Sequence, residues 1–314
     1  MTKYTKYLIW RMCKKIIMSD EVKKYLAYDK KVQIICVNTK DLVQKVVELN
    51  DLTPTTAATA GRVLTASGIV GHTEMKEDDD SVTIQIKGDG PIGNIICVAS
   101  RESNVVKSKI YIQNPHIELP LKPNGKIDVG GAVGKYGYLN IIRKSSITDR
   151  EYSGLVPLVS GEIAEDFTEY FVKSSQKPTV LALGVLVDQN GIRSSGGYML
   201  SLLPDTDEDT IKKIEDNINK IPSISEMLSQ NKTLDEIASI VSGDENVELI
   251  EDDLKIIFEC DCSREKFENG MISLGKEELE KMLNEDGCAE VTCHFCNKKY
   301  FFDKDDLKNM IESI

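Results

Sequence analysis

Four cysteines near the C-terminal end of the chain form two short pairs, Cys260-x-Cys262 and Cys293-x-x-Cys296, which thirty residues separate. Each pair can deliver two thiolates from one short turn to the same side of an ion, and a tetrahedral zinc site requires four such ligands. We therefore predict that these four residues bind one Zn²⁺ per chain. An iron–sulfur cluster also accepts four sulfurs and is the less favoured occupant.

Two neighbouring side chains offer alternative ligands. His294 lies inside the second pair, and Cys288 lies five residues before it. Either could replace one of the four cysteines, but we expect Cys288 to be a spare thiol. The other cysteines stand alone, and no secretory signal precedes them, so the pattern indicates a reducing compartment and metal or thiol chemistry. We expect a cytoplasmic protein.

A closed structural zinc ribbon is the common outcome for paired cysteines, but two features favour a redox switch. Oxidation of Cys260 and Cys262 would close a very small ring, and strained disulfides tend to be the labile, regulatory kind. The segment before the cysteines is also marginal in its own stability. If oxidation released the metal, the unit that the metal folds would lose its main stabilisation.

That marginal segment, residues 204–257, is predicted to be a metastable helical linker. It contains no aromatic residue, and its isoleucines recur at helical spacing from Ile211 to Ile221. Ser223 with Glu226 and Thr233 with Glu236 match the capping-box pattern, and Gly243 is a typical stop. Isolated helices of this length are unstable in water, so they must pack against a neighbour.

Residues 18–203 are predicted to form an α+β core domain built on a large, mainly antiparallel sheet with packed helices. Alternating apolar residues predict strands, as in Val82–Ile86, and Thr53-Pro54 opens a helix rich in small residues. Residues 258–314 are predicted to be a small zinc-binding redox-switch domain, which is too short to rely on an apolar core alone. Residues 1–17 are interpreted as an atypical N-terminal extension.

Charge and motif content exclude several classes of function. Residues 201–314 carry 29 acidic and 13 basic side chains, and the whole chain has a net charge of −12, which disfavours nucleic acid as a partner. No apolar run is long enough to span a membrane. Gly88–Gly93 matches a dinucleotide-binding pattern, but an apolar strand follows it where a helix is required, so we predict a hairpin turn and no use of ATP. His72 and His116 are expected in surface or loop positions.

Several segments resemble the redox-regulated heat-shock protein 33 family of bacterial holdase chaperones. The strongest are Glu259–Glu265, Glu285–Gly287 and Cys293–Cys296 leading to Tyr300. The core agrees at Lys87–Pro91, at Glu169–Phe171 ahead of Pro178-Thr179, and at Ser195–Leu200. The resemblance extends from Met18 to Ile311, and residues 1–17 have no counterpart in it.

This resemblance implies a specific mechanism. The reduced, zinc-bound form would be an inactive monomer, and oxidation would release zinc and form the disulfides Cys260–Cys262 and Cys293–Cys296. The linker would then unfold, and the protein, usually as a homodimer, would bind unfolding client proteins without ATP. It would protect them from aggregation under oxidative and heat stress, and it would not be an enzyme.

Two other functions remain as alternatives. A thiol–disulfide oxidoreductase could use Cys293 and Cys296, but it would need a cysteine pair at a helix N-terminus within a thioredoxin-like unit, and no βαβ pattern surrounds this pair. A structural zinc-ribbon adaptor would need no redox-active ligands. Turnover of a dithiol substrate would favour the first alternative.

Overall fold

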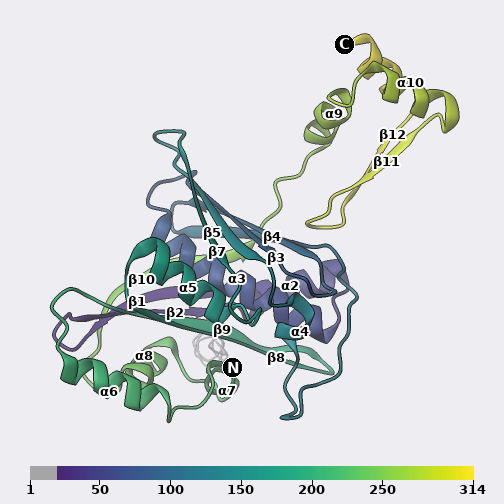
Figure 1. Cartoon of the computed structure of the whole chain (residues 1–314). Helices are drawn as coiled ribbons and strands as arrows, with labels where there is room; N and C mark the ends of the chain where they lie inside the picture. The colour runs from purple at the N-terminus through teal and green to yellow at the C-terminus, as the bar shows by residue number, and fades with distance from the viewer. Residues whose placement is uncertain (1–19) are drawn as a thin grey trace, which may run out of the picture.

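The computed structural model describes residues 20–314, so the expected N-terminal extension lies outside the described residues. Ten strands make up its main sheet: β1 (Glu21–Ala27), β2 (Val32–Asn38), β3 (Ser81–Lys87), β4 (Asn94–Glu102), β5 (Val105–Ile112), β6 (Tyr138–Lys144), β7 (Glu151–Pro157), β8 (Thr179–Asp188), β9 (Gly191–Leu202) and β10 (Glu248–Phe258). Their order across the sheet is β7-β6-β3-β4-β5-β10-β1-β2-β9-β8 (Figure 1). Neighbouring strands are antiparallel except β10 and β5, which run parallel. The prediction of an α+β core with a mainly antiparallel sheet is confirmed.

One face of the sheet shares a large apolar core with α2 (Lys40–Asn50), α3 (Pro54–Glu74), α4 (Val129–Val133) and α5 (Ala164–Ser175). The long helix α3 begins as expected, with Thr53 as its cap and Pro54 in its first turn. It is buried along most of its length and contacts strands in both halves of the sheet. The Gly88–Gly93 segment forms the turn between β3 and β4, as predicted.

The opposite face of the sheet is covered by three short helices, α6 (Glu208–Ile218), α7 (Ile224–Ser229) and α8 (Leu234–Ser242). Side chains alternate along β2, so Ile35 points to the α3 side while Ile34 and Cys36 belong to a second apolar cluster. That cluster joins β1, β2 and β9 to Ile214, Met227 and Ile237 of the three helices. The segment predicted as a linker therefore packs its apolar faces against the sheet (Figure 1).

The capping predictions for these helices are borne out in part. Thr233 and Glu236 form a reciprocal capping box, and Gly243 ends α8 in the left-handed conformation with φ of 72°. Ser223 precedes α7 as expected, but its side chain makes no capping hydrogen bond. Its hydroxyl instead lies 3.4 Å from that of Ser225, so a local side-chain contact replaces the cap.

Residues 248–257, predicted as part of the helical linker, lie in strand β10. The first half of this strand is exposed, while Leu254 and Ile256 in its second half belong to the main core. The strand occupies the position between β5 and β1. The run Glu251-Asp252-Asp253 is unfavourable for strands and concealed this element in the sequence.

His72 differs from its expected surface or loop position. It lies on α3 and is buried, and its Nε2 is 3.0 Å from Oε2 of Glu251 on β10. Burial, the largest influence, lowers the pKa of His72 to about 4. Tertiary packing under β10 explains the difference, because no local sequence pattern reveals it. His116 is exposed in a loop, as expected.

The last segment forms a small unit beyond the sheet (Figure 1). It comprises α9 (Arg264–Ile272), α10 (Lys276–Glu285), β11 (Ala289–Thr292), β12 (Lys299–Phe302) and α11 (Lys304–Glu312). Its own core is small and is formed by Met271, Leu279, Tyr300, Phe302, Leu307 and Met310. Within residues 20–314, no helix has the length and apolar character needed to cross a membrane.

Candidate metal centre

The first cysteine pair follows the end of β10. Cys260 lies two residues beyond Phe258, and Ser263 caps α9 directly after Cys262 by accepting a hydrogen bond from the Lys266 amide. The strand on one side and the capped helix on the other therefore confine this short turn. Because both ends of the segment are fixed, the Cys260 and Cys262 thiols are directed to the same side of the turn.

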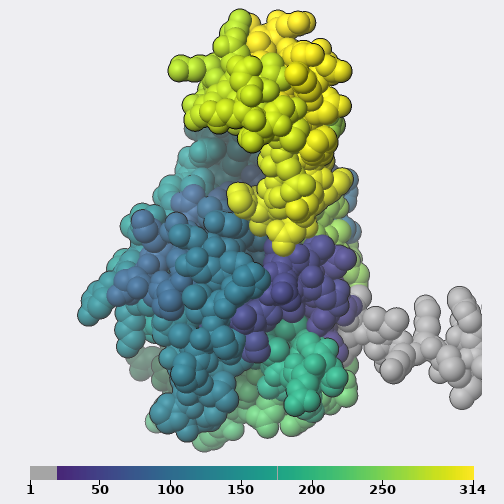
Figure 2. All heavy atoms as spheres, turned by 90° about the vertical axis from the view of Figure 1, so that its right-hand side faces the viewer, coloured from purple at the N-terminus to yellow at the C-terminus, as the bar shows by residue number. Residues whose placement is uncertain are grey.

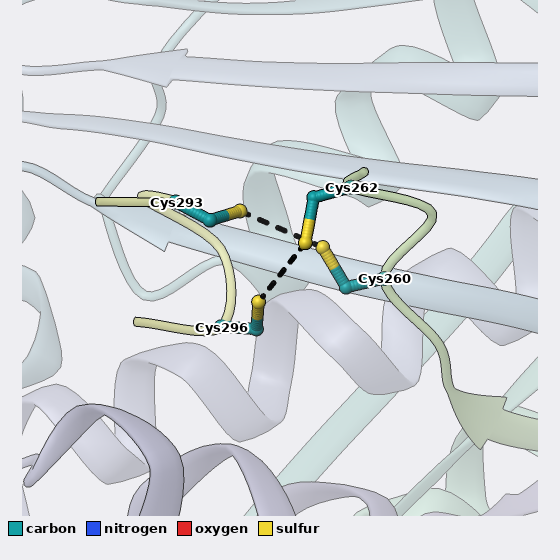
Figure 3. Close-up of side chains that lie close together, drawn as sticks. All are labelled: Cys260, Cys262, Cys293 and Cys296. Atoms are coloured by element: carbon teal, nitrogen blue, oxygen red, sulfur yellow. Dashed lines mark hydrogen bonds between the residues drawn. The ribbon is translucent and has the colours of Figure 1, made fainter. Parts of the chain in front are cut away.

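The second pair lies in the turn between β11 and β12. The amide of Cys293 donates to the carbonyl of Lys298 at 2.9 Å, and the amide of Asn297 donates to the carbonyl of Cys293 at 2.8 Å. Asn297 adopts a positive φ of 56°, a conformation that asparagine tolerates better than most residues. These features curl the turn so that both of its cysteines face the first pair (Figure 3).

The four sulfur atoms all lie within 4.8 Å of one another. Sγ of Cys260 is 3.6 Å from Sγ of Cys293, and Sγ of Cys262 is 3.5 Å from Sγ of Cys296 (Figure 3). A tetrahedral ion with Zn–S bonds of about 2.3 Å would place its sulfurs roughly 3.8 Å apart. The four thiols are free and could hold a metal ion of this kind.

The surroundings of the thiols affect their acidity unequally. Burial raises the pKa of Cys260 and that of Cys296. Burial has the same effect on Cys262, but hydrogen bonds from the Tyr300 hydroxyl and from the neighbouring thiols outweigh it and lower the pKa of Cys262. Cys262 is therefore more readily present as a thiolate, which is the form that binds a metal and reacts with oxidants.

Tyr300 supports the first cysteine pair directly. Its hydroxyl donates to the carbonyl oxygen of Cys262 at 2.9 Å and lies 3.2 Å from Sγ of the same residue. The interaction of this hydroxyl with the Cys262 sulfur is the main reason that the pKa of Tyr300 is raised to about 12. The ring also stacks against Phe267 of α9, with centroids 5.0 Å apart, so its position is fixed by the small core.

The basic side chains around the centre pair mostly with nearby carboxylates. Arg264 pairs with Asp306 at 2.6 Å, and Lys299 pairs with Glu290 at 2.7 Å. Lys266 forms an ion pair with Asp261, between the two cysteines of the first pair, and so does Lys109 of β5. Lys298 lies over the ring of Tyr300, with its Nζ 5.0 Å from the centroid. Lys109 thus joins the cysteine turn to the sheet.

The turn that carries the second pair also contacts the core domain. Asn297 donates from Nδ2 to the carbonyl of Leu49, near the end of α2, at 2.8 Å. The ring of His294 packs against Tyr111 of β5 with centroids 5.4 Å apart, and Nζ of Lys109 lies 5.1 Å from the centroid of Phe295. Figure 2 shows this part of the small unit resting against the region of α2. His294 is thus engaged with the core surface, and neither it nor Cys288 joins the four-sulfur cluster.

Sequence reasoning identified the cysteines but missed Lys109 and Asn297, and it noted Tyr300 only as part of the family resemblance. Asn297 directly follows Cys296, so a turn-forming asparagine beside a paired-cysteine motif was a usable signal. Lys109 is far from the cysteines in sequence, and only the sheet topology brings it to Asp261.

The sequence of this chain is similar to that of known proteins. The family described as Hsp33 protein matches residues 20–303. The chain is 41% identical to the 33 kDa chaperonin of Caldanaerobacter subterraneus, over 94% of this chain and 99% of the relative. It is 42% identical to that of Acetivibrio thermocellus, over 95% of this chain and 98% of the relative.

A solved structure gives the same result. The crystal structure of the 33 kDa chaperonin (heat shock protein 33 homolog) from Thermotoga maritima superposes with a TM-score of 0.83 at 32% identity, and the match covers 94% of this chain and 98% of the other. The resemblance inferred from the cysteine segments is confirmed. This chain belongs to the Hsp33 family.

Proposed function

We propose that this protein is a redox-regulated, ATP-independent holdase chaperone of the cytoplasm. One observation carries the proposal. Four thiols could hold one metal ion, two of them, Cys260 and Cys262, lie directly after β10, and the helices before β10 cover an apolar face of the sheet. Strand β10 therefore connects the thiols to the helices α6, α7 and α8, so a chemical change at the thiols can affect the helices that cover this apolar face.

In the reduced form, Cys260, Cys262, Cys293 and Cys296 would hold one Zn²⁺ as thiolates. A bound zinc ion would tie the two turns together and contribute about 10–16 kcal/mol of binding free energy that is also folding free energy. The small unit needs such a contribution, because its buried cluster has only a few side chains. We expect this form to be an inactive monomer.

Oxidation would convert the thiolates into two disulfides. Each disulfide forms when two thiolates give two electrons to one peroxide molecule, whose O–O bond breaks to yield two hydroxide ions. The family resemblance assigns the pairs as Cys260–Cys262 and Cys293–Cys296. Sulfur contacts of 3.6 and 3.5 Å join Cys260 to Cys293 and Cys262 to Cys296, so peptide mapping without reduction is the measurement that decides the pairing.

Loss of the thiolates would release the metal and unfold the small unit. The ion pairs from Lys107 to Glu259 and from Lys109 to Asp261 hold the segment after β10 and would then weaken. The linker helices, which are short and acidic, would separate from the sheet and expose apolar residues on both surfaces. Unfolding client proteins would bind there without ATP and without nucleic acid, and the oxidised form would be a homodimer.

The test uses the full chain loaded with zinc. Peroxide is added at elevated temperature, zinc release is followed with a chromogenic chelator, and suppression of aggregation of a denaturing client is measured beside it. We expect both signals to rise together, and Cys288→Ser to behave like the unaltered protein. Equal suppression before and after oxidation would show that the switch does not exist.

The alternative functions have less support. Cys293 and Cys296 lie in a hairpin turn and not at a helix N-terminus, where a thioredoxin-like enzyme carries its reactive thiol. A structural adaptor gives no role to the packing of acidic helices over the sheet. Catalytic turnover of a dithiol substrate in the same assay would favour the enzyme.

A further inference from the structure

Strand β10 joins the two halves of the sheet. On one side of it lie β7, β6, β3, β4 and β5, and on the other lie β1, β2, β9 and β8. Within residues 20–314, the backbone edges of β5 and β1 are connected to each other only through this strand. If β10 left the sheet, α3 would still pack under both halves, but two facing strand edges would be free.

The pairing of β10 is irregular for a central strand. Its parallel pairing with β5 covers only Lys255 to Phe258. Its antiparallel pairing with β1 is interrupted by two register shifts, on either side of Lys24. The strand begins shortly after the linker helices and ends two residues before Cys260, so both of its ends depend on segments that oxidation would loosen.

The place that β10 occupies is a formed site for an extended chain. The Lys255 amide donates to the Asn104 carbonyl at 2.8 Å on the β5 side, and the Ile256 amide faces the Asp20 carbonyl at 3.4 Å on the β1 side. Ile256 is fully buried, and its Cδ1 lies 2.9 Å from where a Cβ on Gly68 would be. The glycine of α3 therefore makes room for one apolar side chain of the central strand.

Charge defines the site further. Lys24 on β1 pairs with Glu251 at 3.0 Å, and Lys30 pairs with Glu248 at 3.4 Å. At the other end, Lys107 on β5 pairs with Glu259 at 2.7 Å. If β10 and the adjoining Glu259 left the sheet, these lysines would lose those carboxylates, and Lys107 would keep only its pair with Glu102. An incoming strand would best carry two apolar residues, spaced like Leu254 and Ile256, with carboxylates before and after them.

We propose that the slot between β5 and β1 is a binding site for an extended segment of an unfolded client protein. The client replaces β10 by backbone hydrogen bonding, with an apolar pair seated over Gly68 and acidic residues near Lys24 and Lys107. This inference rests on the proposed function, because oxidation is what frees β10. It names the surface and the kind of segment that the chaperone holds.

A labelled peptide with the sequence of residues 248–259, which includes Glu259, tests the slot. Its binding to the full-length protein is measured by fluorescence anisotropy, in the reduced zinc-loaded form and in the oxidised form. The matched control is the same peptide with N-methyl groups at the positions of Lys255 and Ile256, which keeps every side chain but removes two backbone donors. We expect binding to the oxidised form alone, and binding of the methylated peptide to be about tenfold weaker.

A second variant tests the charges. Lys24→Gln combined with Lys107→Gln is expected to weaken peptide binding by about threefold to tenfold at low salt, and less at high salt. Lys144→Gln on β6 is the matched control, since its lysine pairs with Asp149 far from the slot in the sheet order. This control should bind the peptide as the unaltered protein does.

The outcomes separate this inference from the proposed function. An oxidised protein that suppresses aggregation but does not bind the peptide, or binds both peptides equally, overturns the slot and leaves the holdase intact. An oxidised dimer in which the β10 strand of a second copy fills the slot gives that same lack of binding and also overturns it. If oxidation releases zinc without any suppression of aggregation, the proposed function itself has failed.

Discussion

At the scale of single residues, the centre consists of four sulfurs and one hydroxyl. Tyr300 donates to the backbone of Cys262 and lies beside its sulfur, while its ring packs on Phe267. A group that hydrogen-bonds a metal ligand orients it and tunes its electron density. Tyr300 is therefore a positioning residue for Cys262, whose thiol has a lowered pKa.

Tyr300→Phe tests this role. The ring and its packing remain, but Cys262 loses a donor, so its thiolate becomes less stable and its contact with zinc less well oriented. We expect zinc affinity to fall by about tenfold and peroxide to release zinc faster. Competition with a chelator gives the affinity. Tyr136→Phe, on an exposed turn, is the control. Identical zinc affinities for the two variants would show that Tyr300 does not support the metal centre.

Cys262→Ser tests the ligand set under reducing conditions. A serine oxygen is a poor substitute for a thiolate, so we expect less than one zinc ion per chain by elemental analysis. The melting transition of the small unit should also broaden or disappear. Cys288→Ser, on a thiol outside the four-sulfur cluster, should retain its zinc and its transition. If both variants melt alike, Cys262 is not a ligand.

His72 predicts an acid sensitivity. The histidine is buried, and its pKa falls from the usual 6.5 to about 4. Between these two pH values, His72 is protonated in the unfolded chain and neutral in the folded chain. Stability from this group is complete above pH 6.5 and is lost as pH falls toward 4, by about 3 kcal/mol in total. Urea unfolding from pH 7 to 4 measures it. Burial raises the pKa of Asp20 to about 7, which acts in the opposite direction over this range, so the contribution of His72 is the difference between the unaltered protein and His72→Gln; an identical pH dependence in the two proteins would contradict the assignment.

At the scale of elements, the sequence predicted those structures whose signals are local. The alternation in Val82–Ile86 and the Thr53-Pro54 start marked β3 and α3 correctly, because periodicity and capping are decided by near neighbours. Cysteine spacing marked the two turns for the same reason. Strand β10 was missed because Glu251-Asp252-Asp253 disfavours a strand, and Lys24, which neutralises part of this charge, comes from a distant element.

Ile256→Ala tests the hold of β10 on the core. The side chain is fully buried, so its truncation leaves a cavity and should destabilise the protein by about 2–4 kcal/mol. We also expect client binding to begin at a lower peroxide concentration or temperature. Ile257→Ala is the matched control, because its side chain is 40% exposed on the same strand. Equal thresholds for the two variants would show that β10 does not limit activation.

At the scale of the whole molecule, the small unit rests on the core through a few polar and ring contacts. Asn297 bonds to Leu49, His294 packs on Tyr111, and Lys109 reaches Asp261. The core residues in these contacts, Leu49, Tyr111 and Lys109, are far from the cysteines in sequence, so the docking could not be predicted from the sequence. The order of the strands was unpredictable for the same reason, because β10 pairs with strands made much earlier.

Asn297→Ala combined with Tyr111→Ala should detach the small unit without emptying its metal site. We expect zinc to remain bound, the radius of gyration of the reduced protein to increase, and oxidation to release zinc more quickly. Small-angle X-ray scattering measures the radius of gyration. Asn269→Ala, on an exposed position of α9, is the control. An unchanged scattering profile would mean that other contacts hold the unit.

The position of β10 also has a consequence for biosynthesis. Glu21 pairs with Lys255, so β1 can pair with β2 early, but its other edge stays unpaired until nearly the whole chain has been translated. Until then, β1 and β5 present open edges in a nascent chain, and contacts so distant in sequence form slowly. A protein that we propose to protect others from aggregation therefore passes through its own period of vulnerability each time it is made.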